Sequence, residues 1–338
     1  MNEKACISVC IPAYNASKTI KQTIDSVLAQ TLKNFELVIT DDSSKDDTVD
    51  IIKSIKDRRI KLFTNKIQLG AGRNFEKCKN RAKTEIIFYL ACDDLLDIKA
   101  LEKVHKAFSI SPDIGIVTRP YFWFQGKSLK PVRATKQFLK DKIVSMESPL
   151  NDIRDVIALS DQVSGMGFRK SFLKDKFSNE PFIEISSIVL PMLKKCKAVI
   201  LKDNIIAVRV DQSGSMNPNV YFKSPIMAWY NLINNTYKSN NFRNLREYLI
   251  RNFVANNYVG LVQIKNYGPY KSLLREIYYL LRLKKSNVVS LRFWVYSLLT
   301  ILTPRSLLRK LTRYYKNNIN SMFIRNIAFE HSIKNITS

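Results

Sequence analysis

The 338-residue sequence is short of cysteine, of long apolar runs and of acidic side chains, and each shortage excludes a class of protein. Its five cysteines are odd in number and lack C-x-x-C spacing, which argues against a disulfide framework or a zinc site. We therefore expect a protein of the reducing cytoplasm. The mostly apolar stretch 288–303 is interrupted by Arg292 and ended by Pro304, whereas a spanning helix needs about 20 apolar residues. The first residues, Met-Asn-Glu-Lys, contain no hydrophobic leader, so we expect no secretory signal.

The shortage of acidic residues gives the chain a net charge of +26, and this charge is unevenly distributed. Residues 221–338 contain 19 Lys and Arg against three Glu, whereas residues 1–220 are closer to balance. The last third is therefore a basic module, and we expect it to bind something anionic: lipid headgroups, nucleic acid or a phosphorylated substrate.

Strand-like and helix-like patterns alternate over the first hundred residues. Strands are expected at 6–11, 35–40, 60–64 and 85–91, and helices at 16–30, 46–56 and 71–82. Ser17 is a plausible N-cap of the first helix, and Ser44 or Asp46 of the second. This order predicts an α/β fold with a mostly parallel sheet, so the loops that follow its strands share one edge.

Two of these loops carry polar side chains suited to a nucleotide. Residues 12–15 (Pro-Ala-Tyr-Asn) offer Tyr14 for stacking on a base, although an ordinary turn would also explain them. Asp41 and Asp42 follow the second strand, where a carboxylate accepts a hydrogen bond from a uracil imide N–H. Helix capping alone leaves two aspartates at a strand end unexplained.

The third loop, residues 65–74, contains two glycines that let the backbone approach a phosphate, with Arg73 near a helix N-terminus. No G-x-G-x-x-G follows the first strand, which counts against a nicotinamide-dinucleotide enzyme.

The fourth strand ends in Ala91-Cys92-Asp93-Asp94. Oxygen ligands of this kind suit Mg²⁺ or Mn²⁺, which neutralise a departing diphosphate, although such pairs also cap helices or start turns.

Taken together, these blocks resemble glycosyltransferase family 2, whose GT-A fold enzymes use nucleotide-diphosphate sugars. The resemblance is carried by residues 9–15 (Val-Cys-Ile-Pro-Ala-Tyr-Asn), 26–31 (Ser-Val-Leu-Ala-Gln-Thr), 36–44 (Glu-Leu-Val-Ile-Thr-Asp-Asp-Ser-Ser), 65–74 and 89–94 (Tyr-Leu-Ala-Cys-Asp-Asp). It is strong over residues 5–110 and looser over residues 111–216.

The resemblance implies a role for each matched residue. Pro12, Ala13, Tyr14 and Asn15 would line the nucleotide site, Asp41 or Asp42 would bind the base, and Arg73 would lie near the nucleotide. Asp93 would contact the metal and Asp94 would face the donor sugar. In this sequence Ala91 replaces the first Asp of the family's D-x-D element, so one carboxylate is missing.

The looser half implies an acceptor site around the glycine-containing segment 161–171. The family's catalytic base would fall on Ile185, which leaves Glu184 as the nearest carboxylate, with Glu180 and Asp161 in reserve. Glu184 has an alternative explanation as a helix N-terminal acid stabilised by the helix dipole.

Residues 209–216 resemble the segment that closes the catalytic domain. Arg209 would contact the diphosphate, and Asp211 stands where the family usually has His.

The family resemblance implies a single displacement with inversion, from a nucleotide-diphosphate sugar, most readily a UDP-sugar, to a hydroxyl of a lipid-linked or oligosaccharide acceptor. Mn²⁺ or Mg²⁺ would assist, and the pathway would be cell-surface polysaccharide (O-antigen or capsule) biosynthesis. The catalytic domain is expected at residues 1–216 and a helical, basic, membrane-associating region at 217–338.

The spacing of residues 305–316 predicts an amphipathic helix with Leu307, Leu308 and Leu311 on one face and arginines and lysines on another. This predicts peripheral attachment to an anionic membrane at the inner face of the cell membrane. The alternative is that the apolar face packs on the catalytic domain and the cations are merely solvated.

Two other functions remain open. One is a nucleotidyl- or phosphosugar-transferase, but this sequence has no Gly-rich, Lys-containing phosphate loop after the first strand. A non-catalytic nucleotide- or membrane-binding protein on the same fold is consistent with Ala91, Ile185 and Asp211. Nucleic-acid binding is not expected, because the carboxylates at the strand ends repel phosphate.

Overall fold

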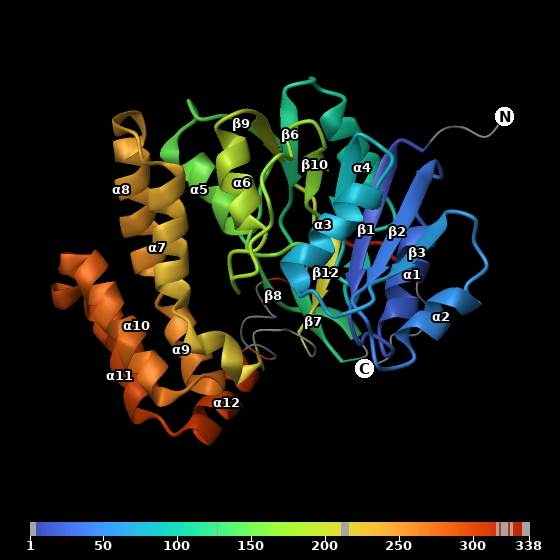
Figure 1. The fold of residues 1–338 in the computed structure, drawn as a ribbon. Coiled ribbons are helices and arrows are strands. Elements are labelled where there is room, and N and C mark those ends of the chain that lie inside the picture. Colours follow the sequence, from blue (N-terminus) through green and yellow to red (C-terminus); the bar gives the residue numbers. More distant parts are fainter. Residues whose placement is uncertain are drawn as a thin grey trace. The chain divides into compact units, whose positions relative to one another are not determined.

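The computed structural model describes residues 5–126, 128–210, 216–315, 318, 324 and 327–332. The chain forms two compact units (Figure 1). The first contains residues 1–179, 184–211 and 323–338, and the second contains 180–183 and 212–322. The chain therefore leaves the first unit, builds the second, and returns to the first.

An eight-stranded sheet forms the centre of the first unit, in the order β3-β2-β1-β4-β10-β6-β11-β9. The strands are β1 (Ile7–Ala13), β2 (Phe35–Asp41), β3 (Ile60–Thr64), β4 (Ile86–Tyr89), β6 (Ile114–Thr118), β9 (Lys142–Val144), β10 (Gly167–Arg169) and β11 (Lys197–Ile200). Strand β1 pairs in parallel with both β2 and β4, so the strand order reverses there. The crevice outside the carboxyl ends of β1 and β4 is where open α/β sheets bind ligands.

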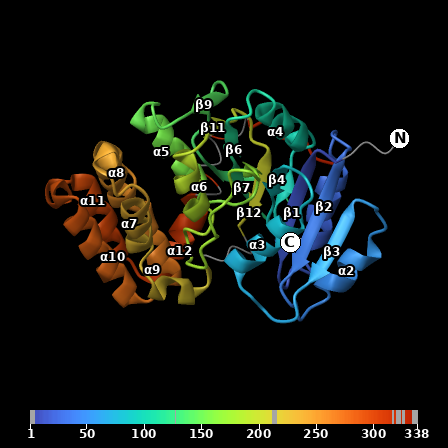
Figure 2. The same ribbon diagram turned by 45° about the horizontal axis from the view of Figure 1, so that its top comes forward.

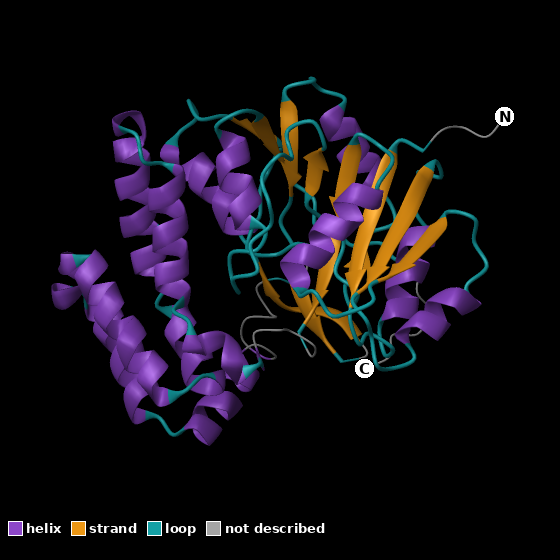
Figure 3. Cartoon of the chain, in the orientation of Figure 1, coloured by secondary structure: helices purple, strands orange, loops and turns teal. Residues whose placement is uncertain are grey.

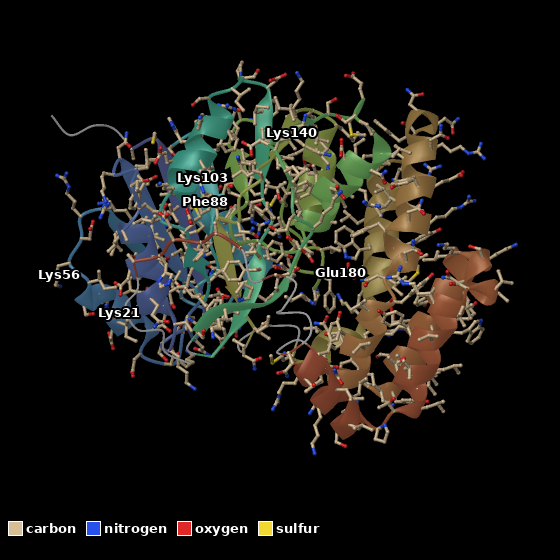
Figure 4. The ribbon with its side chains drawn as sticks, turned by 180° about the vertical axis from the view of Figure 1, so that it is seen from behind. Lys21, Lys56, Phe88, Lys103, Lys140 and Glu180 are labelled. Carbon is tan, nitrogen blue, oxygen red and sulfur yellow. The ribbon has the colours of Figure 1, made fainter. Side chains whose placement is uncertain are left out.

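Continuous apolar sequences explain why these strands lie in the middle of the molecule. All seven residues of β2 are buried, as expected for a strand covered on both faces. Phe88 of β4 is fully buried, and Figure 4 shows it within the sheet while Lys56 lies at the periphery. Helix α3 packs on β1 and β2, and α4 and α6 pack on β6.

A second, smaller sheet has the order β5-β12-β7-β8. Its strands are β5 (Leu95–Leu96), β7 (Phe122–Gln125), β8 (Ser128–Ala134) and β12 (Ile206–Arg209). The returning chain covers it, since Ile327 and Phe329 pack on its core and Phe329 meets Phe122 edge-on with ring centroids 5.1 Å apart. The Glu330 amide also donates to Asp97 (2.9 Å), just beyond β5.

The first three helices of the first unit are shorter than the predicted ranges 16–30, 46–56 and 71–82. The helices of this unit are α1 (Ile20–Leu28), α2 (Thr48–Ser54), α3 (Ala71–Arg81), α4 (Ala100–Phe108), α5 (Leu150–Leu159) and α6 (Ser186–Leu193). The predicted N-cap positions are shifted: α1 begins after Thr19 and α2 after Asp47, and neither of these side chains caps its helix, whereas the Asp46 carboxylate does accept from the Thr48 amide (3.1 Å) at the start of α2. Ser17 instead donates its amide to Asp46 (3.0 Å), because this carboxylate joins the loops before the two helices.

The second unit is helical (Figure 3). Its α-helices are α7 (Pro225–Thr236), α8 (Arg243–Asn252), α9 (Val259–Tyr267), α10 (Tyr270–Leu283), α11 (Leu291–Leu302) and α12 (Arg305–Tyr314). Helix α9 packs against α10, α11 and α12, which Figure 2 shows gathered around it. Across the residues that are described, no helix combines the length and the apolarity needed to cross a membrane.

Candidate active site

The loops that follow β1 and β2 are hydrogen-bonded to each other. Asn15 adopts a left-handed conformation (φ 47°), which asparagine tolerates better than most residues. Its amide donates to Ser44 Oγ (2.9 Å) and its side-chain oxygen accepts from the Lys45 amide (2.8 Å). The turn after Pro12 and Ala13 is thereby fixed, and the Tyr14 ring is 40% exposed beside it.

Asp41 is buried at the end of β2. Its carboxylate accepts from the Ser44 amide (3.0 Å) and from Ser44 Oγ (2.5 Å). Ionised carboxylates have about four acceptor positions, so two of them remain for another donor.

Asp42 is also buried, but its carboxylate accepts three hydrogen bonds from the loop between β3 and α3. The donors are Asn65 Nδ2 (2.9 Å), the Leu69 amide (2.9 Å) and the Gly70 amide (2.8 Å). Asp42 therefore fixes the conformation of the loop that leads to Arg73.

That loop enters α3 under tight steric constraints. Gly70 has φ 84°, and a Cβ on Gly72 would lie 2.3 Å from the Ser178 carbonyl oxygen, so both positions require glycine. The Arg73 amide donates to Asn179 Oδ1 (3.2 Å), and its side chain is exposed at the N-terminus of α3. The two glycines thus allow close backbone packing within the protein, in addition to any approach of a phosphate.

Asp93 and Asp94 follow β4 and differ in their surroundings. Asp94 is buried, and its carboxylate accepts from Ser164 Oγ (2.5 Å) and from the Arg209 amide (2.8 Å). Asp93 is partly exposed, and among the described residues only its own amide donates to its carboxylate. Asp93 is therefore the carboxylate of this pair that can bind a ligand.

Burial and the neighbouring charge disfavour ionisation of this pair. Burial, followed by the charge of Asp94, raises the pKa of Asp93 well above its usual range, and Arg209 opposes this shift. Burial raises the pKa of Asp94 to about 6, against the hydrogen bonds from Ser164 and Arg209. A cation beside Asp93 would relieve the repulsion between the two carboxylates.

Arg209 holds the turn that contains both aspartates. It is 2% exposed, its Nε donates to the Asp93 carbonyl (3.1 Å) and its NH2 donates to Gln22 Oε1 (3.0 Å). Its guanidinium also lies 4.8 Å from the centre of the Phe124 ring. Arg209 thus positions the Asp93 turn, and its predicted contact with a diphosphate stays a prediction. Asp211 lies outside the described residues.

Arg119, a buried arginine behind this turn, was not among the predicted site residues. Arg119 donates to the carbonyls of Leu159 (3.1 Å) and Ser164, and burial lowers the pKa of its guanidinium to about 10. A Cβ on Gly165, which has φ 85°, would lie 2.5 Å from Arg119 Nε. The glycine next to Ser164 was the available signal, since it marks a backbone packed too closely for any side chain.

Arg119 also connects the Asp94 side of the site to Asp161. Its guanidinium stacks 4.8 Å from the centre of the Tyr121 ring, and Tyr121 Oη donates to Asp161 (2.5 Å). The pKa of Asp161 is raised, because the effect of burial outweighs the opposing effects of the Tyr121 hydrogen bond and of the nearby arginines. Nearby, Arg133 stacks 3.4 Å from the centre of the Trp123 ring.

The other candidate bases lie around the start of α6. Glu184 is partly exposed, and its carbonyl accepts from Ser187 Oγ (2.6 Å) in the first turn. Ile185 is buried at the N-cap position, where a carboxylate would be costly. Glu180 belongs to the second unit, and its side chain is labelled in Figure 4.

The carboxylates of this site fit a divalent cation that takes most of its ligands from the substrate phosphates and water. Within the described part of the chain, no cluster of three or more His, Cys, Asp or Glu forms a metal cage. Mg²⁺-like ions commonly use one or two carboxylates together with substrate phosphates and water. One accessible carboxylate, Asp93, meets that requirement.

The fold is that of solved glycosyltransferases. The structure of Staphylococcus aureus TarS in complex with UDP matches 95% of this chain and 90% of its own, with TM-score 0.57 and 15% identity. The mannosyltransferase PcManGT from Pyrobaculum calidifontis, in complex with GDP-Man and Mn²⁺, matches 93% of this chain and 88% of its own, with TM-score 0.55 and 13% identity. The predicted GT-A fold, with a mostly parallel sheet and C-terminal helices, is confirmed.

The sequence narrows this class to a family. Residues 8–175 match the model of "Glycosyl transferase family 2", and through them the chain belongs to that family, as predicted. A relative from Escherichia coli, the UDP-Glc:alpha-D-GlcNAc-diphosphoundecaprenol beta-1,3-glucosyltransferase WfaP, is 46% identical over 88 residues, which are 26% of this chain and 35% of WfaP. Three curated relatives are matched over only 36%, 35% and 38% of their own length.

Proposed function

We propose that the protein transfers a sugar from a UDP-sugar to a hydroxyl of a lipid-linked glycan, with inversion, during assembly of a bacterial cell-surface polysaccharide. The observation that carries the proposal is Asp93, a partly exposed carboxylate where β4 ends beside β1, the strand at which the sheet order reverses. Capping or turn formation does not account for it, because Asp94 and Arg209 already hold the turn.

The similar proteins support each half of this reaction. TarS was solved with UDP and PcManGT with GDP-Man and Mn²⁺, which favours a nucleotide-sugar donor and a divalent metal here. WfaP is named for transfer of glucose from UDP-Glc to a GlcNAc carried on diphosphoundecaprenol, which favours a lipid-linked acceptor.

The donor would be bound by the loops at the carboxyl edge of the sheet. Asp41, with acceptor capacity to spare, would accept the imide N–H of uracil, and the exposed Tyr14 ring would stack on the base. Asp93 would hold Mn²⁺ or Mg²⁺, which when bound neutralises charge on the leaving diphosphate. Arg73 would add a guanidinium at the N-terminus of α3, where the helix dipole also favours an anion.

The acceptor hydroxyl must lose a proton as it attacks the anomeric carbon. We assign this proton to Glu184, which precedes α6 and is partly exposed. Asp161 is the competing base, because Tyr121 fixes its carboxylate and burial raises its pKa.

Calorimetric titration with UDP, with and without Mn²⁺, tests the donor site, with GDP, CMP and ADP as comparison ligands. We expect UDP-selective binding that Mn²⁺ strengthens, and loss of the Mn²⁺ effect in Asp93→Asn. If none of the nucleotides binds, the protein is the non-catalytic relative that Ala91 and Ile185 would also fit.

The base is identified by two matched variants, Glu184→Gln and Asp161→Asn. We expect Glu184→Gln to lower transfer about 10²- to 10⁴-fold while UDP affinity is unchanged. Loss of transfer in Asp161→Asn, with near-normal transfer in Glu184→Gln, would move the base to Asp161.

A lipid-linked acceptor places the reaction at a membrane. We therefore include an anionic membrane surface, at the cytoplasmic face of the cell membrane, among the partners of the proposed function. The basic last third of the chain supports this assignment.

A further inference from the structure

Helix α11 in the second unit has its apolar side on the outside. The residues that it buries in the protein include Ser297 and Thr300, both 0% exposed. Leu291 and Leu302, at its two ends, are 79% and 74% exposed. A helix of a soluble protein normally buries its apolar stripe and exposes its polar residues, so this helix is reversed.

The exposed apolar residues of α11 form one continuous stripe. Its exposed aliphatic residues are Leu291, Val295, Leu298, Leu299 and Leu302, which we call the outward face of α11. Their spacings of three, four and seven residues place them on one side of a helix. The inner side is anchored independently, since Phe293 is fully buried against Tyr258 with ring centroids 5.6 Å apart.

The burial of polar groups beneath α11 shows that this orientation is held by packing. Thr300 Oγ1 donates back to the carbonyl of Tyr296 (2.8 Å), while Ser297 Oγ has no partner among the described residues. An unpaired buried hydroxyl is costly, and turning the stripe inward would remove that cost. The exposed leucines and the buried serine cost stability, which indicates that the exposed stripe has a function of its own.

Apolar exposure continues on both sides of α11. Val288 and Val289 precede it and are exposed. On α12, Leu307 and Leu311 are exposed, whereas Leu308, on the same side of the helix, is buried, so only part of the apolar face predicted for residues 305–316 packs on the protein.

The segment that contains α11 carries charge of one sign. The sequence from residue 277 to residue 329 contains no Asp or Glu. Its exposed cations include Arg282, Lys285, Lys310 and Arg313, on elements that precede or follow α11. An apolar stripe in a segment that carries only positive charge is complementary to acyl chains beneath anionic headgroups.

We propose that the outward face of α11 is the surface by which this protein docks into an anionic lipid monolayer, which deepens the membrane partner of the proposed function. The 12 residues of α11 span about 18 Å, less than the ~30 Å hydrocarbon core, so the helix lies in the interface. Trp294 suits that depth, because its indole N–H donates to the Val288 carbonyl (2.7 Å) and its ring is partly exposed.

The same features disfavour other occupants. A second copy of the chain would bring two wholly basic surfaces together, and the repulsion would oppose a symmetric dimer. Nucleic acid would satisfy the cations but would leave five aliphatic side chains without an apolar partner. A lipid monolayer satisfies both sets of groups.

Vesicle co-sedimentation of the full chain tests the docking surface. We expect binding to vesicles that contain phosphatidylglycerol and much weaker binding to phosphatidylcholine alone. Leu298→Asn combined with Leu302→Asn should weaken binding about tenfold or more, because each inserted leucine contributes favourable transfer. The matched control is Leu139→Asn in the first unit, also an exposed leucine, which should bind like the parent protein.

Charge and folding are checked separately. Lys310→Glu combined with Arg313→Glu should remove the preference for phosphatidylglycerol, and thermal melts of all variants should match that of the parent protein. If the leucine variant binds vesicles normally, the proposal is wrong. It is equally wrong if the parent protein is a dimer that the leucine variant dissociates while vesicle binding persists.

Failure of docking can be distinguished from failure of the proposed function. Vesicle binding needs no sugar donor, so it stands even if no transfer is found. Conversely, the leucine variant should keep its transfer rate on a short, water-soluble acceptor and lose it only on a vesicle-embedded one.

Discussion

Two strands of the central sheet are followed by an Asp-Asp dipeptide, and the two pairs differ in how protein donors hold them. After β2, Asp42 accepts three hydrogen bonds from the next loop, whereas Asp41 accepts two, both from Ser44. After β4, Asp94 accepts two hydrogen bonds, and Asp93 remains partly exposed. The donors at each carboxylate, which the dipeptide itself does not reveal, separate Asp42, which shapes a loop, from Asp41 and Asp93, which keep acceptor capacity for a ligand.

The largest expected effect comes from removing the charge of Asp93. Asp93→Asn should lower sugar transfer about 10³-fold, or about 4 kcal/mol, because the charge opposite the leaving diphosphate is lost. Its melting temperature should match that of the parent protein, since the described residues give this carboxylate no donor but its own amide. Initial rates and a thermal melt measure both quantities. Unchanged turnover would contradict the role of Asp93.

The opposite result is expected at Asp42. Asp42→Ala leaves the partly buried amides of Leu69 and Gly70 without an acceptor, and should lower the free energy of unfolding by about 2 kcal/mol. Urea unfolding measures this change, with Asp47→Ala, an exposed neighbour, as the control. Equal stability of the two variants would mean that Asp42 does not hold the loop.

Asp41 should show an intermediate, ligand-specific effect. Asp41→Asn weakens the acceptor offered to the uracil imide, so UDP should bind about tenfold more weakly while CMP changes little. Calorimetry of both nucleotides on both proteins gives the comparison. A uniform loss of affinity for UDP and CMP would indicate a disturbed loop instead of base recognition.

The smallest effect concerns the pH dependence of stability at Asp46. Burial acts to raise the pKa of Asp46, but hydrogen bonds from Thr48 and Ser17 outweigh it and lower the pKa. In the unfolded chain the pKa of an aspartate is about 3.9. A carboxylate whose pKa is lower in the folded state stabilises the fold when the pH is above about 3.9, and this stabilisation is lost as the pH falls through the lowered pKa. The difference in melting temperature between the parent protein and Asp46→Asn should therefore shrink below about pH 4. A difference that is constant from pH 3 to pH 7 would refute the assignment.

The fold could be predicted from the sequence because its central strands, such as β2, are buried on both faces and read as continuous apolar runs. The strand expected at 60–64 is β3 with the same bounds, although this edge strand is only partly buried, and the polar residues of the GT-A resemblance follow β1, β2, β3 and β4. Helix ends were less predictable. The Ser17 cap is wrong because the Ser17 amide donates to Asp46, which lies in a loop that sequence spacing does not relate to it, while the same Asp46 carboxylate accepts from the Thr48 amide at the start of α2.

The support of the candidate site could not be predicted, because it depends on residues far apart in the chain. Ser164 lies 70 residues from Asp94, and Arg209 lies 115 residues from it, yet both bond to its carboxylate. The sequence likewise shows a mostly apolar stretch at residues 288–303 but contains no information on which of its side chains pack inward. That choice is made by tertiary contacts such as the one between Phe293 and Tyr258.

The return of the chain to the small sheet has a consequence for the order of synthesis. Phe329 and Glu330 pack beside Leu95 and Asp97, close in sequence to the Asp93 turn. A ribosome adds about 5–20 residues per second, so roughly 120 residues, or about 6–24 s, separate the emergence of β12 from that of its cover. During that interval the apolar side chains of the small sheet lack the cover that Ile327 and Phe329 provide, and the first unit is completed only when the basic helical unit has already been made.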